Sequence, residues 1–249
     1  MRKFAHHVHI RKRYIIALLL LPALLISGFQ KVSSYFEEQH IAALSWTVAN
    51  KLIVIDPGHG GLDPGALGTT GIHEKDMVLE VSKKLALILQ EAGAEAVLTR
   101  ETDRDLSDPV ADYSYQAKIQ DLSRRVELAN SRNADIFVSV HVNSFSDPRE
   151  DGPQTFSQPG SAESKKLAQA IQFEFNRFLA NPGREAKQVD YFANRMTKMP
   201  STIVEIGFIT NPKEEKLLLD EHYQNKVAWT IYAGIVRYFA QPKPAFALP

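Results

Sequence analysis

Short apolar runs alternate with helical patterns over most of the chain. The four clearest runs are bounded by polar or turn-forming residues, as buried strands are, and they cover residues 52–55, 96–98, 136–140 and 202–204. Apolar residues recur at helical spacing within residues 78–92, 167–178 and 227–239. Strands that alternate with helices predict the α/β fold class: a mostly parallel, twisted central sheet with helices on both faces, in a single domain.

The N-terminal segment has a different pattern. Five of the 29 Lys and Arg residues lie within the first 13 positions, and residues 14–30 then form an apolar run without a charge. Cations ahead of a run near the lower length limit for crossing a bilayer predict export, with the basic end kept in the cytoplasm. A weak small-residue site at residues 32–34 leaves open whether the segment is a removed signal peptide or a retained membrane anchor.

The rest of the chain has a simple predicted organisation. We expect a targeting segment at residues 1–34, a connector at 35–50, one globular domain at 51–240 and a short tail at 241–249. No internal repeat and no second globular segment follows the predicted domain, so no appended wall-binding module is expected.

Composition and charge exclude several classes of protein. The chain of 249 residues has no cysteine, which excludes a disulfide scaffold, a thiolate nucleophile and a metal site built on sulfur. Acids and bases number 29 each, but the first 13 residues hold five bases and no acid, so the remainder carries 24 bases against 29 acids. A domain with this negative balance is not expected to bind nucleic acid.

A glycine-rich segment follows the first predicted strand. Six of the 13 glycines lie between positions 58 and 71, where they allow close backbone approach and sharp turns. A dinucleotide-binding loop would need a third glycine at position 63, which is Asp63. The chain also has no phosphate-binding loop and no Gly-x-Ser-x-Gly nucleophile motif, so these three common chemistries lose their usual support.

Four residues with metal-binding or acid–base chemistry lie near strand ends. His59 follows the first strand, His141 and Glu205 are expected to end two others, and Glu74 opens a helix after the glycine-rich loop. Ligands of open α/β sheets bind beyond the carboxyl ends of the strands. Two imidazoles and a carboxylate can hold Zn²⁺ with one position open, and a remaining carboxylate can carry a proton to a leaving amine.

Each of these residues also has an ordinary structural interpretation. A single histidine after a strand is usually a hydrogen-bonded turn residue, and Glu74 would be stabilised by the dipole of the helix that it opens. A buried carboxylate at Glu205 is harder to explain structurally, because it is unfavourable unless it is paired. The spacing does not decide which of the two glutamates would bind the metal.

Four motifs resemble one family of enzymes. They occur in order at residues 56–61 (DPGHGG), 74–76 (EKD), 139–144 (SVHVNS) and 205–211 (EIGFITN). The pattern is similar to that of the zinc-dependent N-acetylmuramoyl-L-alanine amidases of bacterial cell walls, over about residues 51–240. The resemblance implies that residues 51–240 form a zinc amidase catalytic domain with one Zn²⁺ per chain.

The resemblance also assigns roles to individual residues. It implies His59, Glu74 and His141 as the zinc ligands and Glu205 as the catalytic acid and base. Asn143 and Gly61 are candidate substrate contacts, and for Asn143 a role in orienting His141 or in a structural turn stays open. Arg100 is expected to hold the loop through an ion pair.

Residues 113–126 and 223–239 resemble the germination-specific subgroup of that family. This similarity implies an extracytoplasmic enzyme, in the intermembrane or cortex region of the forespore, that removes stem peptides from peptidoglycan glycan strands before a separate muramic acid deacetylase acts and muramic-δ-lactam forms. We expect its timing to come from expression, zinc supply or a regulatory protein partner, whose identity stays open. The alternatives are a housekeeping cell-separation amidase, a zinc hydrolase acting on another wall bond, and a wall-binding protein without catalysis.

Overall fold

The computed structural model describes residues 20–21, 25, 28, 32, 35–109, 112–179 and 183–241. The chain divides into two units, Met1–Ala43 and Leu44–Pro249. In the first unit, the described residues from 35 to 43 are helical. All but four positions of the predicted signal or anchor segment, residues 14–30, lie outside the described residues. Within the described part of the chain, no helix has the length and apolar character needed to span a membrane.

The second unit is built on one six-stranded sheet with the strand order β2-β1-β3-β6-β4-β5. The strands are β1 (Leu52–Pro57), β2 (Glu95–Leu98), β3 (Ile136–Asn143), β4 (Gln154–Ser157), β5 (Lys187–Gln188) and β6 (Ser201–Phe208). Neighbouring strands run parallel except β4 and β6, which are antiparallel. The prediction of a mostly parallel α/β sheet is confirmed.

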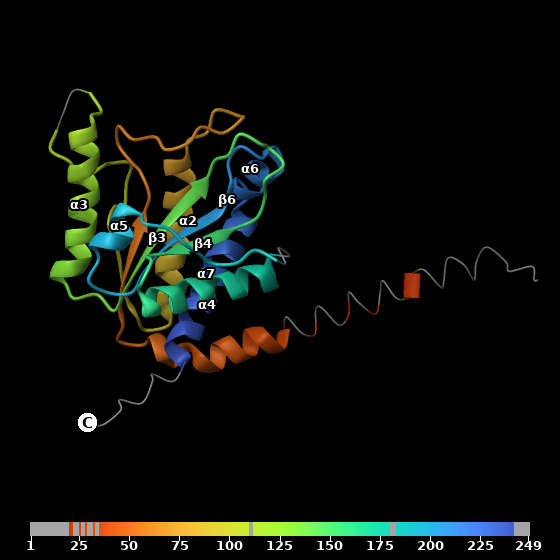
Figure 1. Ribbon diagram of the computed structural model, residues 1–249. Helices are drawn as coiled ribbons and strands as arrows, with labels where there is room; N and C mark the ends of the chain where they lie inside the picture. Colours follow the sequence, from red (N-terminus) through yellow and green to blue (C-terminus); the bar gives the residue numbers. More distant parts are fainter. Residues whose placement is uncertain are drawn as a thin grey trace, which may run out of the picture. The chain divides into compact units, whose positions relative to one another are not determined.

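Helices cover both faces of this sheet (Figure 1). α2 (Glu74–Glu91), α4 (Ala162–Phe178) and α7 (Glu221–Ala240) pack together on one face, and α6 (Pro212–Leu218) contacts α7. α3 (Tyr115–Ser131) and the short α5 (Phe192–Met196) lie on the other face, and the 3₁₀ helix η1 (Ser45–Val48) precedes β1. Because both faces are covered, the central strands are buried on both sides and read as continuous apolar runs in the sequence.

The helix ends follow local signals in the sequence. The side chain of Ser114 accepts a hydrogen bond from Ala117 N at the start of α3, and Asp220 does the same for Tyr223 N at the start of α7. After α2, Gly93 takes a left-handed conformation with φ of 84° and ends the helix. The start of α3 therefore determines where the loop that follows β2, at the carboxyl edge of the sheet, ends.

Two strands are longer than the sequence pattern indicated. The prediction that His141 and Glu205 terminate their strands is wrong, because β3 continues to Asn143 and β6 continues to Phe208. His141 and Glu205 are paired with each other in the register of these two parallel strands. Backbone pairing therefore continues through these polar residues, whose side chains project from the sheet rather than from loops, although the register of β3 and β6 shifts between His141 and Asn143.

Candidate active site

The segments that carry His59 and His141 are brought together by the pairing of β1 and β3. Pro57 is in register with Val140, and Gly58 N donates a hydrogen bond to Val140 O at 3.0 Å. This places Gly58 directly beneath the imidazole of His141, where a Cβ would clash with the ring. Glycine is therefore required here, because the backbone that leads to His59 must pass close to His141.

His59, Glu74 and His141 converge on one point. The Glu74 Oε1 atom lies 3.2 Å from His59 Nε2 and 3.0 Å from His141 Nδ1. One potential ligand atom from each of the three residues lies within 4.8 Å of the others. Three donors this close, two imidazole and one carboxylate, can hold a divalent cation, so the structure brings together three residues that the sequence nominated from separate motifs.

Glu74 is fixed by the backbone around it. Its Oε1 atom accepts a hydrogen bond from Val142 N at 3.0 Å, and its Oε2 atom accepts one from Ala66 N at 2.9 Å. Burial favours the neutral form, but the contacts with His141 and His59 outweigh it and hold the pKa of Glu74 well below its usual range. The carboxylate of Glu74 is therefore ionised and held in one orientation, although Glu74 is only 4% exposed.

Asp63 contacts the second ring nitrogen of His59. The Oδ2 atom of Asp63 lies 3.0 Å from His59 Nδ1 and accepts a hydrogen bond of 2.7 Å from the hydroxyl of Tyr113. Burial disfavours a charged His59, but Asp63 and Glu74 overcome this and raise the pKa of His59 to about 9. Asp63 thus orients the ring so that Nε2 points to Glu74, a contact that the sequence analysis missed.

Two buried arginines hold the backbone of the His59 loop. Arg125 donates to Asp56 Oδ1 at 2.9 Å and to Pro57 O at 2.7 Å. Arg100 donates to Pro57 O at 3.0 Å and to Gly58 O at 2.9 Å. Among the described residues Arg100 forms no ion pair, so the expected ion pair is wrong: it holds the loop through carbonyl oxygens.

Glu205 differs from the other members of the site. It projects from β6 beside His141, and its buried Oε2 atom has no hydrogen-bond partner among the described residues. Burial, together with the charge of Glu74, raises the pKa of Glu205 to about 7 although His141 and His59 oppose the shift. A carboxyl group with such a pKa can take up and release a proton near neutral pH.

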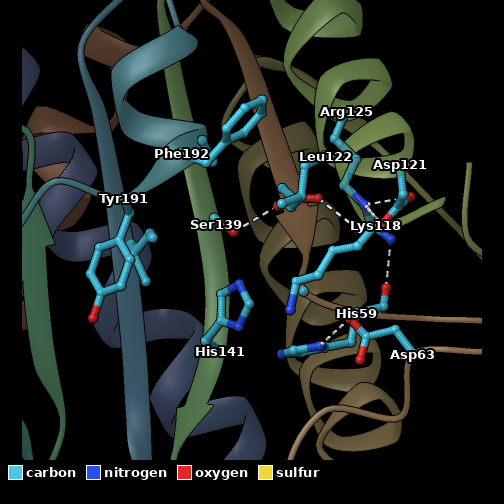
Figure 2. Close-up of a pocket in the computed structure, with 14 residues that line it drawn as sticks. His59, Asp63, Lys118, Asp121, Leu122, Arg125, Ser139, His141, Tyr191 and Phe192 are labelled. Carbon is cyan, nitrogen blue, oxygen red and sulfur yellow. Dashed lines mark hydrogen bonds and ion pairs between the residues drawn. The ribbon is translucent and has the colours of Figure 1, made fainter. Parts of the chain in front are cut away.

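A cavity of about 210 Å³ adjoins the two imidazoles. Figure 2 shows it between α3, α5 and the strands of the sheet. The apolar part of its lining comes from both helices and from β6: Leu122, Tyr191, Phe192, Ala193 and Ile203. Its polar lining includes His59 and His141 together with Lys118, Ser139 and three aspartates. The cavity therefore joins the candidate metal site to an enclosed space that can accept part of a substrate.

The two predicted substrate contacts, Gly61 and Asn143, are engaged within the protein. Gly61 N donates to Asp103 Oδ1 at 2.8 Å, and its carbonyl accepts from Lys75 Nζ at 2.8 Å. Asn143 Oδ1 accepts from Ser144 N at 2.8 Å, as a residue in a structural turn would. Substrate contact by either residue stays a prediction.

Comparison with known proteins now decides the family. The family model for N-acetylmuramoyl-L-alanine amidase matches residues 53–237. The chain belongs to the N-acetylmuramoyl-L-alanine amidase family. The predicted enzyme class is thereby confirmed, since a relative described as a germination-specific amidase, from Bacillus subtilis, is 41% identical over 199 residues, which are 79% of this chain and 83% of the relative.

Other amidases support the same assignment. The amidase LytC of Bacillus subtilis is 33% identical over 86% of this chain but over only 42% of its own length. The solved structure of the CwlD amidase from Clostridioides difficile, in complex with the GerS lipoprotein, matches with a TM-score of 0.73 and 39% identity, over 76% of this chain and 98% of that one. Similarity in sequence and similarity in fold therefore indicate the same family for this amidase.

Proposed function

We propose that this amidase hydrolyses the amide between the lactyl group of N-acetylmuramic acid and the L-alanine of the stem peptide, with one Zn²⁺ held by His59, Glu74 and His141. The convergence of these three side chains beside Glu205, whose Oε2 atom has no hydrogen-bond partner among the described residues, is the observation that carries the proposal. The globular domain that we assign to this activity spans residues 51–240.

The donor set fits zinc. Two imidazole nitrogens and one carboxylate oxygen are the ligands of many catalytic zinc sites, which keep a fourth position open. The contact between Asp63 and His59 Nδ1 supports this assignment, because metal-binding histidines usually place their second nitrogen against a carboxylate or carbonyl. When bound, zinc supplies Lewis acidity, which polarises a carbonyl oxygen and lowers the pKa of water.

Glu205 is proposed to move the proton. With a pKa near neutrality, its carboxylate accepts the proton released by the attacking water and donates it to the nitrogen of L-alanine as the amide breaks. Glu74 cannot do this as well, because its oxygens are engaged by backbone N–H groups and imidazoles. The stem peptide leaves with a free amino terminus and the glycan strand stays intact.

Mass spectrometry of digested peptidoglycan tests the activity. An amidase releases peptides with N-terminal L-alanine and leaves peptide-free muramic acid, whereas a deacetylase leaves an amine on the sugar and a binding protein leaves the wall unchanged. We expect the first result, its loss when a chelator removes the metal, and its return on addition of zinc. Persistent amidase activity in fully metal-free protein would contradict the zinc assignment.

We also propose a role in the spore cortex, supported by the 41% identity to the germination-specific amidase over most of its length. The enzyme would act outside the cytoplasmic membrane, in the forespore intermembrane region, before a separate deacetylase converts the exposed muramic acid to muramic-δ-lactam. Deletion of the gene should then abolish the lactam in cortex peptidoglycan. Unchanged lactam together with chains of unseparated cells would favour the cell-separation alternative instead.

The solved complex of CwlD with the GerS lipoprotein supports a protein partner for this chain as well. We propose a lipoprotein on the same outer side of the membrane as the substrate. Copurification of one lipoprotein with the full-length chain from sporulating cells is the expected result. If no lipoprotein copurifies, expression and zinc supply would remain as the means that control amidase activity.

A further inference from the structure

Each acid that lines the cavity already has a partner other than Lys118. Asp56 and Asp121 both pair with the buried Arg125, at 2.9 Å in each case. Asp63 lies against His59 and accepts the hydroxyl of Tyr113. None of these carboxylates forms an ion pair with Lys118.

Lys118 is the charged residue of the cavity lining that lacks such a partner among the described residues. Its side chain is exposed, and its ammonium group makes no hydrogen bond or ion pair within the part of the chain that the structure describes. Figure 2 shows the side chain extending from α3 across the cavity, in the direction of His59 and His141. The cavity beside the candidate metal site thus contains an ammonium group that has no ion-pair partner among the described residues.

The position of Lys118 in its helix is unfavourable for stability. It is the fourth residue of α3, close to the positive end of the helix dipole, and the first turn of this helix has no acidic residue. A cation near a helix N-terminus lowers stability. The ammonium group and the positive end of the helix dipole both favour an anion near the start of α3.

The proposed substrate contains a group near the bond that is cut that can be an anion. The second residue of the stem is a glutamate joined through its side-chain carboxyl group, so its α-carboxyl group is either a free carboxylate or a carboxamide. Two extended residues span about 7 Å from the bond that is cut. A cavity of about 210 Å³ next to His59 and His141 can admit a group at that distance.

We propose that Lys118 binds the free α-carboxylate of the second stem residue and makes the enzyme prefer this stem to its carboxamide form. The inference rests on the proposed amidase function and deepens it, since it names the form of substrate that the site selects. Lys118 acts as a specificity residue, by contacting a part of the substrate that does not react.

The test compares two glycan–peptide substrates that differ only in carboxylate or carboxamide at the second stem residue. For the carboxylate substrate, we expect Lys118→Met to lower kcat/KM about tenfold or more, mainly through KM, because one hydrogen bond between charged groups is lost. For the carboxamide substrate, the change should stay within about twofold by the same reasoning, because no charge pair is lost. Lys118→Arg should keep the preference.

Lys165→Met is the matched control, because Lys165 is an exposed lysine on α4, on the opposite face of the sheet. It should leave both substrates unaffected. An equal loss on both substrates in Lys118→Met would overturn the inference, since it would place the ammonium at the reacting carbonyl. Cleavage of both substrates without preference would also overturn it and leave the amidase function standing, whereas cleavage of neither by the zinc-loaded wild type would contradict the function itself.

Discussion

The start of α2 and the middle of β6 each supply one glutamate to the site, but the two surroundings are opposite. Glu74 receives backbone N–H groups from Val142 and Ala66 and lies against two imidazoles, which hold its pKa well below its usual range. Glu205 is also enclosed, yet its Oε2 atom has no partner among the described residues, and burial raises its pKa to about 7.

This difference indicates how two identical side chains can take different roles. A carboxylate surrounded by hydrogen-bond donors stays ionised and rigid, which suits a metal ligand. A carboxyl group that lacks donors exchanges a proton easily, which suits an acid and base. The environment of each glutamate, rather than its position in a motif, separates the proposed ligand from the proposed catalyst.

Replacement of the Glu74 carboxylate should have the largest effect. We expect Glu74→Gln to lose the metal and to lower turnover by roughly 10³-fold or more, because a ligand and its charge are removed together. Metal content after gel filtration and amidase turnover are the measurements. Glu80→Gln on the exposed side of α2 is the control and should keep both, and retention of metal by Glu74→Gln would contradict the ligand assignment.

A third buried carboxylate, Asp56, extends the comparison to stability. It accepts hydrogen bonds from Thr99 and Ser139 at 2.6 Å and pairs with Arg125. Burial alone would raise its pKa, but these partners lower it to about 2 from an ordinary value of 3.8. Asp56→Asn should lower the free energy of unfolding at pH 7 by roughly 3 kcal/mol, because Arg125 loses a buried partner.

The effect of Asp56 should depend on pH in a defined direction. Because the folded-state pKa is depressed, its contribution is complete above about pH 4 and is lost as the pH falls toward 2, by about 2 kcal/mol in total. Urea unfolding of wild type and Asp56→Asn between pH 6 and pH 3 measures this effect. The difference between their free energies of unfolding should start to narrow below about pH 4. A gap that widens on acidification would contradict this account.

A smaller effect is expected at Asp63, which acts on the metal only through His59. Asp63→Asn keeps the shape of the side chain but removes the charge beside His59 Nδ1, so zinc affinity should fall about 10- to 100-fold. Tyr113→Phe, which removes one donor to Asp63, should have a weaker effect in the same direction. Competition with a chromogenic chelator measures both, and an unchanged affinity in Asp63→Asn would show that His59 needs no support.

Much of the fold could be predicted from the sequence, because its central strands are buried on both faces and its principal helices are amphipathic. α3 was not among the predicted helices. Its inward side carries Asp121 and Arg125 as well as Val126 and Ala129, so no continuous apolar stripe marks it. These charged residues are buried because they pair with each other and hold the loop of His59, a contact that requires the folded chain.

The metal-binding and acid–base residues of the candidate site could be predicted from the sequence, but the residues around them that orient a ligand or contact the substrate could not. His59, Glu74, His141 and Glu205 carry ligand chemistry and lie beside recognisable apolar runs, so they could be selected from the sequence. Asp63 and Lys118 could not be selected, because their roles depend on which atoms their side chains face in the folded chain. For Asp63 the one available signal was its place four residues after His59 in a glycine-rich loop.

The most direct test of the contrast between the two glutamates is Glu205→Gln, with zinc content and amidase turnover measured on the same sample. The account predicts one zinc per chain, as in wild type, and turnover lowered by about 10²-fold or more, because only proton transfer is lost. Loss of zinc together with turnover, in a variant that unfolds at the wild-type temperature, would make Glu205 a ligand and contradict the account.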